Sequence, residues 1–268
     1  MILLSYSVIS FDQRGNDNHN INKSLTTYTG NVCFGFADSS GRFLLTKNLN
    51  YVSKNSYYVI ISSGKIFKLD FIEKREERKE NTGRQTDSNF SNLGGYLFKS
   101  QYIKLEPDNT YLIADSNFLS RNVPLPLEPV PHNSLSKNEI KRIEGVKRKI
   151  IKSSWEVGKT DDGLMLALIL FQPENDTALA SLVLIKNDLY VFEDIPGNLK
   201  NEHSVWRVDD GGEFEAESIN VLALFDSRDG YAIARNWAGE EGENSVLLIQ
   251  KGNVFKPLME NYRYWMPE

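Results

Sequence analysis

Carboxylates are the residues of this chain best suited to do chemistry. Asp161 and Asp162 precede Gly163, and Asp229 precedes Gly230, so acids occupy equivalent positions in two similar segments. Asp-Gly is ordinary turn chemistry, because both residues tolerate the backbone conformations of tight turns. The alternative is that Asp162 and Asp229 are the acid and base of a glycoside hydrolase, which needs two carboxyl groups at a definite separation. Turn chemistry is the favoured interpretation.

The last quarter of the chain holds a second set of acids. Residues 213–217 read Glu-Phe-Glu-Ala-Glu, and on a strand the three carboxylates would share the face opposite Phe214 and Ala216. A solvated sheet face is one interpretation. The other is a docking surface for a basic partner, since complementary charge steers association. The candidate binding residues are Asp209, Asp210, Glu213, Glu215, Glu217, Glu240, Glu241 and Glu243.

Other catalytic and ligand-binding patterns are missing from the sequence. His19, His132 and His203 lack the spacing of a helical zinc site, and Cys33 is the only cysteine, so we expect no metal and no cofactor. Neither a Gly-x-Ser-x-Gly motif nor a phosphate-binding glycine loop occurs. Cys33 lies in the apolar run 32–36, which predicts a buried, unreactive thiol.

Composition limits the class of protein. The 268 residues are 40% hydrophobic and 25% charged, as in a globular protein, and the net charge is −5. This mild negative charge argues against general nucleic-acid binding, which needs a concentrated basic surface, so we expect a protein partner and no specific nucleic acid.

Localisation is inferred from what the sequence lacks. The apolar residues 1–10 have no basic n-region and no cleavage site, which predicts a first strand rather than a signal peptide. No apolar stretch is long enough to span a membrane. A single cysteine suits the cytoplasm, and an exported protein that has lost a leader is the alternative.

The elements that must position these residues repeat along the chain. A glycine followed by a short apolar strand recurs four times, and each copy is followed by a β-hairpin pattern. Successive hairpins start about 63 residues apart, a spacing typical of repeated β units. The glycines are Gly41, Gly95, Gly163 and Gly230, and the expected hairpins cover 58–68, 111–119, 182–190 and 246–256.

Four similar β units predict an all-β fold, and we favour a four-bladed β-propeller. A ring of units leaves only short, protected strand edges, and residues 1–10 would help to close it. A double β-sandwich, with two units in each half, is the alternative. The chain shows neither the Trp-Asp dipeptide nor the double glycine of the common propeller repeats.

The middle of the chain departs from the β pattern. Residues 121–131 contain four prolines and should be extended. Ser136 and Glu139 then form a capping-box pattern, which predicts one inserted helix near 136–152. The expected organisation is β units one and two at 1–120, a proline-rich connection and helix at 121–153, and units three and four at 154–268, or one closed domain over 1–268.

The predicted helix is rich in lysine and arginine. Such a helix can contact anionic lipid or nucleic acid, but more often it packs by its isoleucines and leaves its cations in water. The latter interpretation is favoured here. The cations are Lys137, Lys141, Arg142, Lys147, Arg148, Lys149 and Lys152.

These patterns favour a non-enzymatic protein-binding module. Repeated β folds without a catalytic pattern commonly serve as scaffolds whose loops bind another macromolecule. One version is an inhibitor or immunity-type protein that recognises a basic partner. A propeller-type glycan hydrolase that uses Asp162 and Asp229 is the alternative.

Overall fold

The computed structural model describes residues 31–47, 49, 51–52, 54–201, 203–207 and 210–265. The expected first strand at 1–10 and His19 lie outside these residues. The described chain is all-β, with two short helices, neither of which is long and apolar enough to cross a membrane. The helical segments are α2 (Ser116–Leu119), α3 (Lys137–Lys147) and the 3₁₀ turns η1 (Phe90–Asn92) and η2 (Ala216–Ser218).

The first six strands form a closed antiparallel barrel in the order β1-β2-β5-β4-β3-β6, with β6 pairing back to β1. Its interior is filled by buried side chains such as Cys33, Leu44 and Phe98. Burial raises the pKa of the Cys33 thiol to about 12, which confirms the predicted buried cysteine. The strands are β1 (Val32–Ala37), β2 (Phe43–Thr46), β3 (Tyr57–Ile60), β4 (Ile66–Arg75), β5 (Gly95–Ser100) and β6 (Thr110–Asp115).

The other ten strands form one curled sheet in the order β7-β13-β14-β15-β16-β12-β11-β10-β9-β8. It consists of two antiparallel four-stranded meanders, β9–β12 and β13–β16, with β8 and β7 at the edges. A single parallel pair, Phe192 with Val254, joins them. The strands are β7 (Asn122–Leu125), β8 (Glu128–Pro129), β9 (Ile151–Lys159), β10 (Met165–Phe171), β11 (Thr177–Lys186), β12 (Leu189–Asn198), β13 (Asn220–Ser227), β14 (Gly230–Ala238), β15 (Gly242–Lys251) and β16 (Val254–Tyr264).

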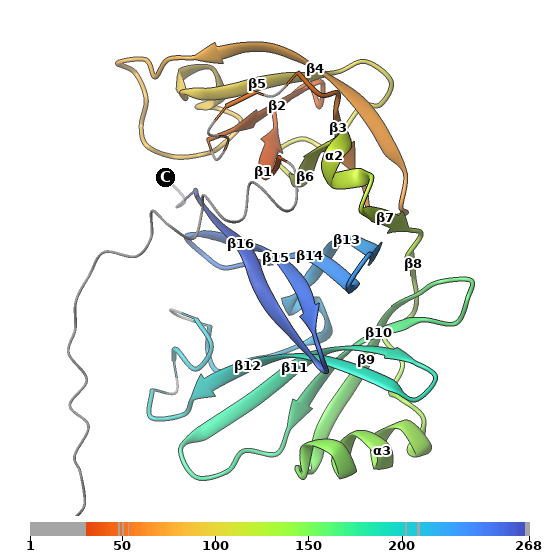
Figure 1. Cartoon of the computed structure of the whole chain (residues 1–268). Helices are drawn as coiled ribbons and strands as arrows, with labels where there is room; N and C mark the ends of the chain where they lie inside the picture. The colour runs from red at the N-terminus through yellow and green to blue at the C-terminus, as the bar shows by residue number, and fades with distance from the viewer. Residues whose placement is uncertain are drawn as a thin grey trace, which may run out of the picture.

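These elements stack in four layers (Figure 1). The sheet curls so that its two meanders share one core, in which Leu166 of β10 and Leu248 of β15 are buried. The other face of β13–β15 packs on the barrel, where Leu247 joins a cluster with Leu112 of β6. Helix α3 covers the far face of β9–β12 with Ile143. Strands β13–β15 are therefore largely buried on both faces, between the barrel and β9–β12.

The local β signals are largely confirmed. All four expected glycines have positive φ, and they begin or precede β2, β5, β10 and β14. Three of the four hairpins form, as β3–β4, β11–β12 and β15–β16. The prediction of a hairpin at 111–119 is wrong. The Asp115 side chain accepts a hydrogen bond from the Phe118 N–H, and helix α2 begins there directly after β6.

The described strands do not form a four-bladed propeller. A propeller needs each unit to form its own sheet, whereas β1 pairs with both β2 and β6, and β3 pairs with β6. The strands expected in the first two units therefore close on one another as one barrel. The strands of the last two units join edge to edge in one curled ten-stranded sheet. They therefore do not form a β-sandwich of two separate sheets.

The predicted helix begins where expected but ends early. The capping box of Ser136 and Glu139 is present at the start of α3. The helix ends at Lys147 rather than near residue 152, because Arg148 adopts a left-handed conformation with φ of 53° and β9 begins at Ile151.

Candidate functional site

A polar hollow of about 610 Å³ lies where the barrel meets the meander β13–β16. We call it the acidic hollow, because four carboxylates and one cation line it, together with three asparagine side chains and one tryptophan. Its lining includes Asp108 and Asn109 of the barrel, and Glu217, Asn220, Asn236, Glu240, Glu243, Arg263 and Trp265 of the later chain.

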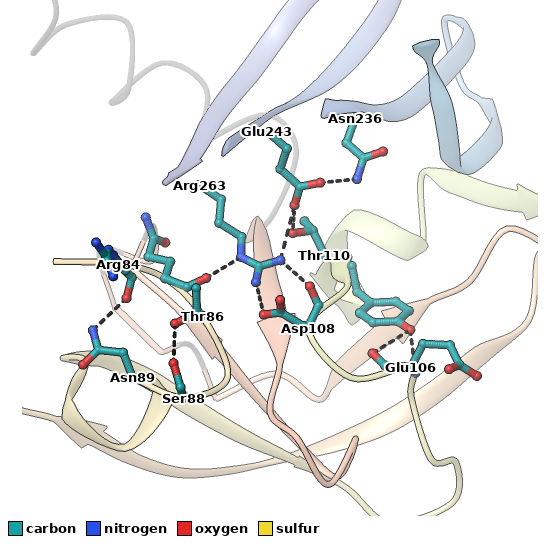
Figure 2. A network of polar contacts seen from close by, with 12 residues as sticks. Arg84, Thr86, Ser88, Asn89, Glu106, Asp108, Thr110, Asn236, Glu243 and Arg263 are labelled. Carbon is teal, nitrogen blue, oxygen red and sulfur yellow. Dashed lines mark hydrogen bonds and ion pairs between the residues drawn. The ribbon is translucent and has the colours of Figure 1, made fainter. Parts of the chain in front are cut away.

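Arg263, near the end of β16, is the central residue of this site (Figure 2). Its side chain is 2% exposed. Its Nε donates to the Gln85 carbonyl oxygen at 2.8 Å, and its terminal nitrogens donate to both the backbone and the side chain of Asp108. Burial lowers the pKa of Arg263, against the opposing effect of Asp108 and Glu243. Arg263 therefore ties the sheet to two loops of the barrel.

Glu243 of β15 makes a second set of polar contacts between the sheet and the barrel. It accepts hydrogen bonds from the Thr110 hydroxyl of β6 and from the Asn236 amide, the latter at 2.6 Å. Its Oε1 lies 3.7 Å from Nη1 of Arg263. Burial raises the pKa of Glu243, and burial likewise raises the pKa of Asp108. The expectation that Glu243 belongs to an exposed acidic surface is corrected, because this carboxylate is 6% exposed.

The rim of the hollow carries the accessible acids. Glu217 is 72% exposed, and its Oε1 lies 3.2 Å from Nδ1 of His132. Glu240 is exposed in the β14–β15 turn, and its carbonyl oxygen accepts a hydrogen bond from the Trp265 indole at 3.1 Å. Glu241 follows it and is also exposed. The hollow thus has buried, paired charges at its base and exposed carboxylates at its edge.

The segment 213–217 exposes its acids without being a strand. Glu213, Glu215 and Glu217 are exposed, whereas Phe214 and Ala216 are buried. The expected alternation is confirmed, but the expected strand is wrong. Glu215 has an extended backbone, and its reciprocal side-chain bonds with Ser218 begin η2 instead.

Asp210 points inward rather than into solvent. Its carboxylate accepts hydrogen bonds from the backbone N–H groups of Val205, Trp206, Arg207 and Gly212. Burial acts to raise the pKa of Asp210, but these donors outweigh it and hold the pKa below its usual value. Asp210 therefore organises its own loop, and Asp209 lies outside the described residues. Of the predicted acids, Glu217, Glu240 and Glu243 are the ones that line the hollow.

The two aspartates of the hydrolase alternative lie elsewhere. Asp162 accepts a hydrogen bond from Nζ of Lys186 at 2.6 Å, and this bond, with a second from Thr160, lowers its pKa to about 2. A carboxylate that stays ionised at neutral pH is poorly suited to act as a general acid. Asp229 is exposed in the β13–β14 turn. Neither residue lines the acidic hollow.

Several cations of the basic helix segment are engaged with the protein itself. Arg142 donates to Asp188 at 2.9 Å and Lys147 donates to Asp194 at 2.6 Å, both on the sheet that α3 covers. Just beyond the helix, Lys149 donates to Glu174 at 2.6 Å. These pairs support the favoured interpretation of α3 as a packed helix.

Sequence reasoning missed Asp108 and Arg263. Asp108 and Arg263 are 155 residues apart, so no local pattern connects them. The signal that was available is the alternation of β15, which places Glu243 on the same face as buried Leu247. Among the described residues, no group of three or more His, Cys, Asp and Glu side chains could hold a metal ion.

The arrangement is suited to accept a cation, because carboxylates and amide oxygens line a hollow between the barrel and the sheet, and Glu217 and Glu240 among them are exposed. No protein-family model matches the chain, and no curated protein or solved structure is significantly similar to it, so the functional argument depends on the site alone.

Proposed function

We propose that this protein is a non-enzymatic binding module that recognises a basic segment of a partner protein at the acidic hollow. The observation that carries the proposal is the imbalance of charge in the lining. Four carboxylates face one cation, Arg263, and that cation is buried and already bonded to Asp108. Of the exposed acids, Glu240 forms no ion pair within the described residues, and Glu217 contacts only the imidazole of His132, which is not part of the lining.

The chemistry of the hollow fits an arginine or lysine side chain. Carboxylates form short, charge-assisted hydrogen bonds with such groups, and a guanidinium can bond to a carboxylate through two nitrogens. The amide oxygens of Asn109, Asn220 and Asn236 offer further acceptors. Trp265 supplies an aromatic surface against which the aliphatic part of the side chain can pack.

The exposed acids beyond the hollow would extend this recognition. Glu213, Glu215 and Glu241 are exposed and close in sequence to the rim residues. Charges of one sign around a contact surface raise the rate of association with an oppositely charged partner. One version of the proposal is an inhibitor or immunity-type protein that covers a basic surface of a partner enzyme.

A defined peptide tests the site directly. The probe is a fluorescent eight-residue peptide of alternating arginine and glycine, measured by anisotropy at low salt. Glu217→Lys with Glu240→Lys should weaken binding at least about tenfold, because two carboxylates become two cations at the rim. The matched control, Glu128→Lys with Asp161→Lys, makes the same charge change at exposed positions outside the hollow. Equal weakening in both variants would contradict the proposal.

The same variants identify the natural partner. Wild-type protein and both double variants serve as baits in lysate of the source cell, and retained proteins are identified by mass spectrometry. The proposal predicts a basic protein that the wild type and the control variant retain and that the Glu217→Lys, Glu240→Lys variant loses. A partner retained equally by all three baits would place recognition outside the hollow.

A further inference from the structure

A second hollow, of about 550 Å³, lies on the barrel and has the opposite charge. We call it the basic hollow. It is lined by Arg42, just before β2, by Lys99 of β5, and by Tyr102 and Lys104 in the segment after β5. It shares no lining residue with the acidic hollow.

The cations of the basic hollow are unpaired. Arg42, Lys99 and Lys104 are all exposed, and none of them forms an ion pair within the part of the chain that the structure describes. The carboxylate of Asp70 is close by, but it accepts a hydrogen bond from the Gln101 amide. Three cations around one concavity make a surface that favours an anion.

The backbone of the hollow also offers donors. The Ser100 N–H donates to the Arg42 carbonyl oxygen and the Leu105 N–H donates to the Gly41 carbonyl oxygen, both at 2.8 Å. These bonds hold both ends of segment 101–104 against the turn before β2. None of the four N–H groups in 101–104 donates a hydrogen bond within the described residues. Backbone N–H groups that lack a protein acceptor are suitable donors to phosphate oxygens.

An exposed aromatic ring completes the hollow. Tyr102 is 71% exposed, the largest exposure among the described large hydrophobic side chains. Lys99 also lies beside Phe43 of β2, with its Nζ 6.0 Å from the ring centroid. Aromatic rings beside cations are the arrangement by which proteins stack a nucleic-acid base and hold its phosphate.

We infer that the basic hollow binds a nucleotide unit, with the phosphate against Arg42, Lys99 and Lys104 and the base stacked on Tyr102. The volume lies within the range of small-molecule sites. The unit could belong to a free nucleotide or to a single strand, since the recognised chemistry is the same. The net charge of −5 is a sum over the chain and does not describe this local surface. The inference is independent of the proposed function.

The test compares three ligands by calorimetry at about 50 mM salt. They are deoxyadenosine monophosphate, an eight-nucleotide deoxyadenosine oligomer, and deoxyribose 5-phosphate, which lacks the base. At least one nucleotide ligand should bind about tenfold more tightly than the sugar phosphate. An oligomer that binds far more tightly than the mononucleotide indicates a single strand, and equal affinities indicate a free nucleotide. A sugar phosphate that binds as tightly as both nucleotide ligands, or no binding at all, would overturn the inference.

Two variants assign the binding to this hollow. Tyr102→Ala should weaken nucleotide binding about tenfold, as loss of one stacked base does. Arg42→Gln with Lys104→Gln should weaken it by a similar factor and reduce its dependence on salt. The matched control, Lys251→Gln with Lys256→Gln, removes two exposed cations of β15 and β16 and should change the affinity less than about twofold. Unchanged affinity in the first two variants would overturn the inference.

Discussion

The acidic hollow and the basic hollow both use residues of the barrel, but they hold their charges in different surroundings. In the acidic hollow, Arg263 and Glu243 are buried and bonded across the junction with the sheet. In the basic hollow, Arg42, Lys99 and Lys104 are exposed and carry no ion pair within the described residues. Buried charges that lose their partners cost stability, whereas exposed unpaired charges cost little and can meet a ligand.

This difference separates charged residues that hold the two units together from charged residues that are exposed to a ligand, and the sequence does not distinguish these two roles. Glu243 was expected to bind a partner because it belongs to an acidic run, but the structure places it at the junction between barrel and sheet. Glu217 and Glu240 belong to the same predicted set of acids and are exposed. The surroundings of a charged residue, rather than its membership of a charged run, therefore decide whether it is free to bind.

The largest expected effect is on stability, from Arg263→Met. The change leaves Asp108 and Glu243 without their shared cation, and removal of one partner from a buried charge network costs about 3–5 kcal/mol. Urea denaturation gives the free energy of unfolding. Arg42→Met removes an exposed cation of the basic hollow and should cost less than about 0.5 kcal/mol. Similar losses in the two variants would remove the distinction between the hollows.

Gly41→Ala should have the next largest effect. Gly41 has a φ of 66°, and a Cβ there would overlap the Leu105 carbonyl oxygen. Leu105 anchors the segment of the basic hollow, because its N–H donates to the Gly41 carbonyl oxygen. We expect a loss of about 1–3 kcal/mol and weaker nucleotide binding. Gly252→Ala is the control, because Gly252 has a φ of 62° but no neighbour within 4 Å of the added carbon. If both variants lose the same free energy of unfolding, the close approach of Gly41 to Leu105 does not contribute to stability.

Glu243→Gln tests the buried carboxylate through pH. Burial raises the pKa of Glu243, so the folded protein keeps this proton to a higher pH than the unfolded chain. This group's contribution to the free energy of unfolding therefore falls as pH rises from the ordinary glutamate pKa through the raised one. The free energy of unfolding of the wild type minus that of Glu243→Gln should therefore decrease as pH rises over that window. The decrease should be the same at low and high salt, since buried charges are weakly screened. A pH-independent difference would contradict the burial effect.

The smallest expected effect is that of Asp162→Asn. The pair with Lys186 is largely exposed, and such pairs contribute less than about 1 kcal/mol. Because the pKa of Asp162 is lowered to about 2, its contribution is complete above the ordinary aspartate pKa and is lost as pH falls towards 2. Thermal melts of Asp162→Asn, Lys186→Gln and the double variant should show non-additive losses. Additive losses would mean that the two residues do not interact.

The sequence predicted features that depend on neighbours along the chain. Each of the four glycines lies at or just before a strand, the hairpin at 246–256 depends on its own turn, and Ser136 begins α3 through a bond three residues away. The hairpin at 111–119 failed for a local reason as well, because Asp115 has a helix-capping alternative.

The sequence did not predict how the strands close. Pairings such as that of β3 with β6 depend on which distant edges meet, and the hydrophobic patterns of a blade and of a barrel strand are alike. Prediction of the acidic hollow would have required the same knowledge of which distant strand edges meet. Its acids Glu217 and Glu240 were found from the charge of the last quarter of the chain, but Asp108 and Arg263 meet only after the barrel docks on the sheet.

The single parallel pair between β12 and β16 has a mechanical consequence. A small sliding of β9–β12 against β13–β16 would disturb the Phe192–Val254 pair, the bond from the Phe192 N–H to the Asn253 carbonyl oxygen, and the buried ion pair of Arg235 with Glu193, rather than a full ladder. Shear of packed layers is a common form of domain motion. The lining of the acidic hollow comes from the barrel and from residues 217–265. A shift of β9–β12 would therefore reach the hollow through Glu217, which contacts His132. The neighbouring Asn133 carbonyl oxygen accepts a hydrogen bond from the Glu156 N–H of β9, so His132 lies on a segment that is bonded to the shifting half.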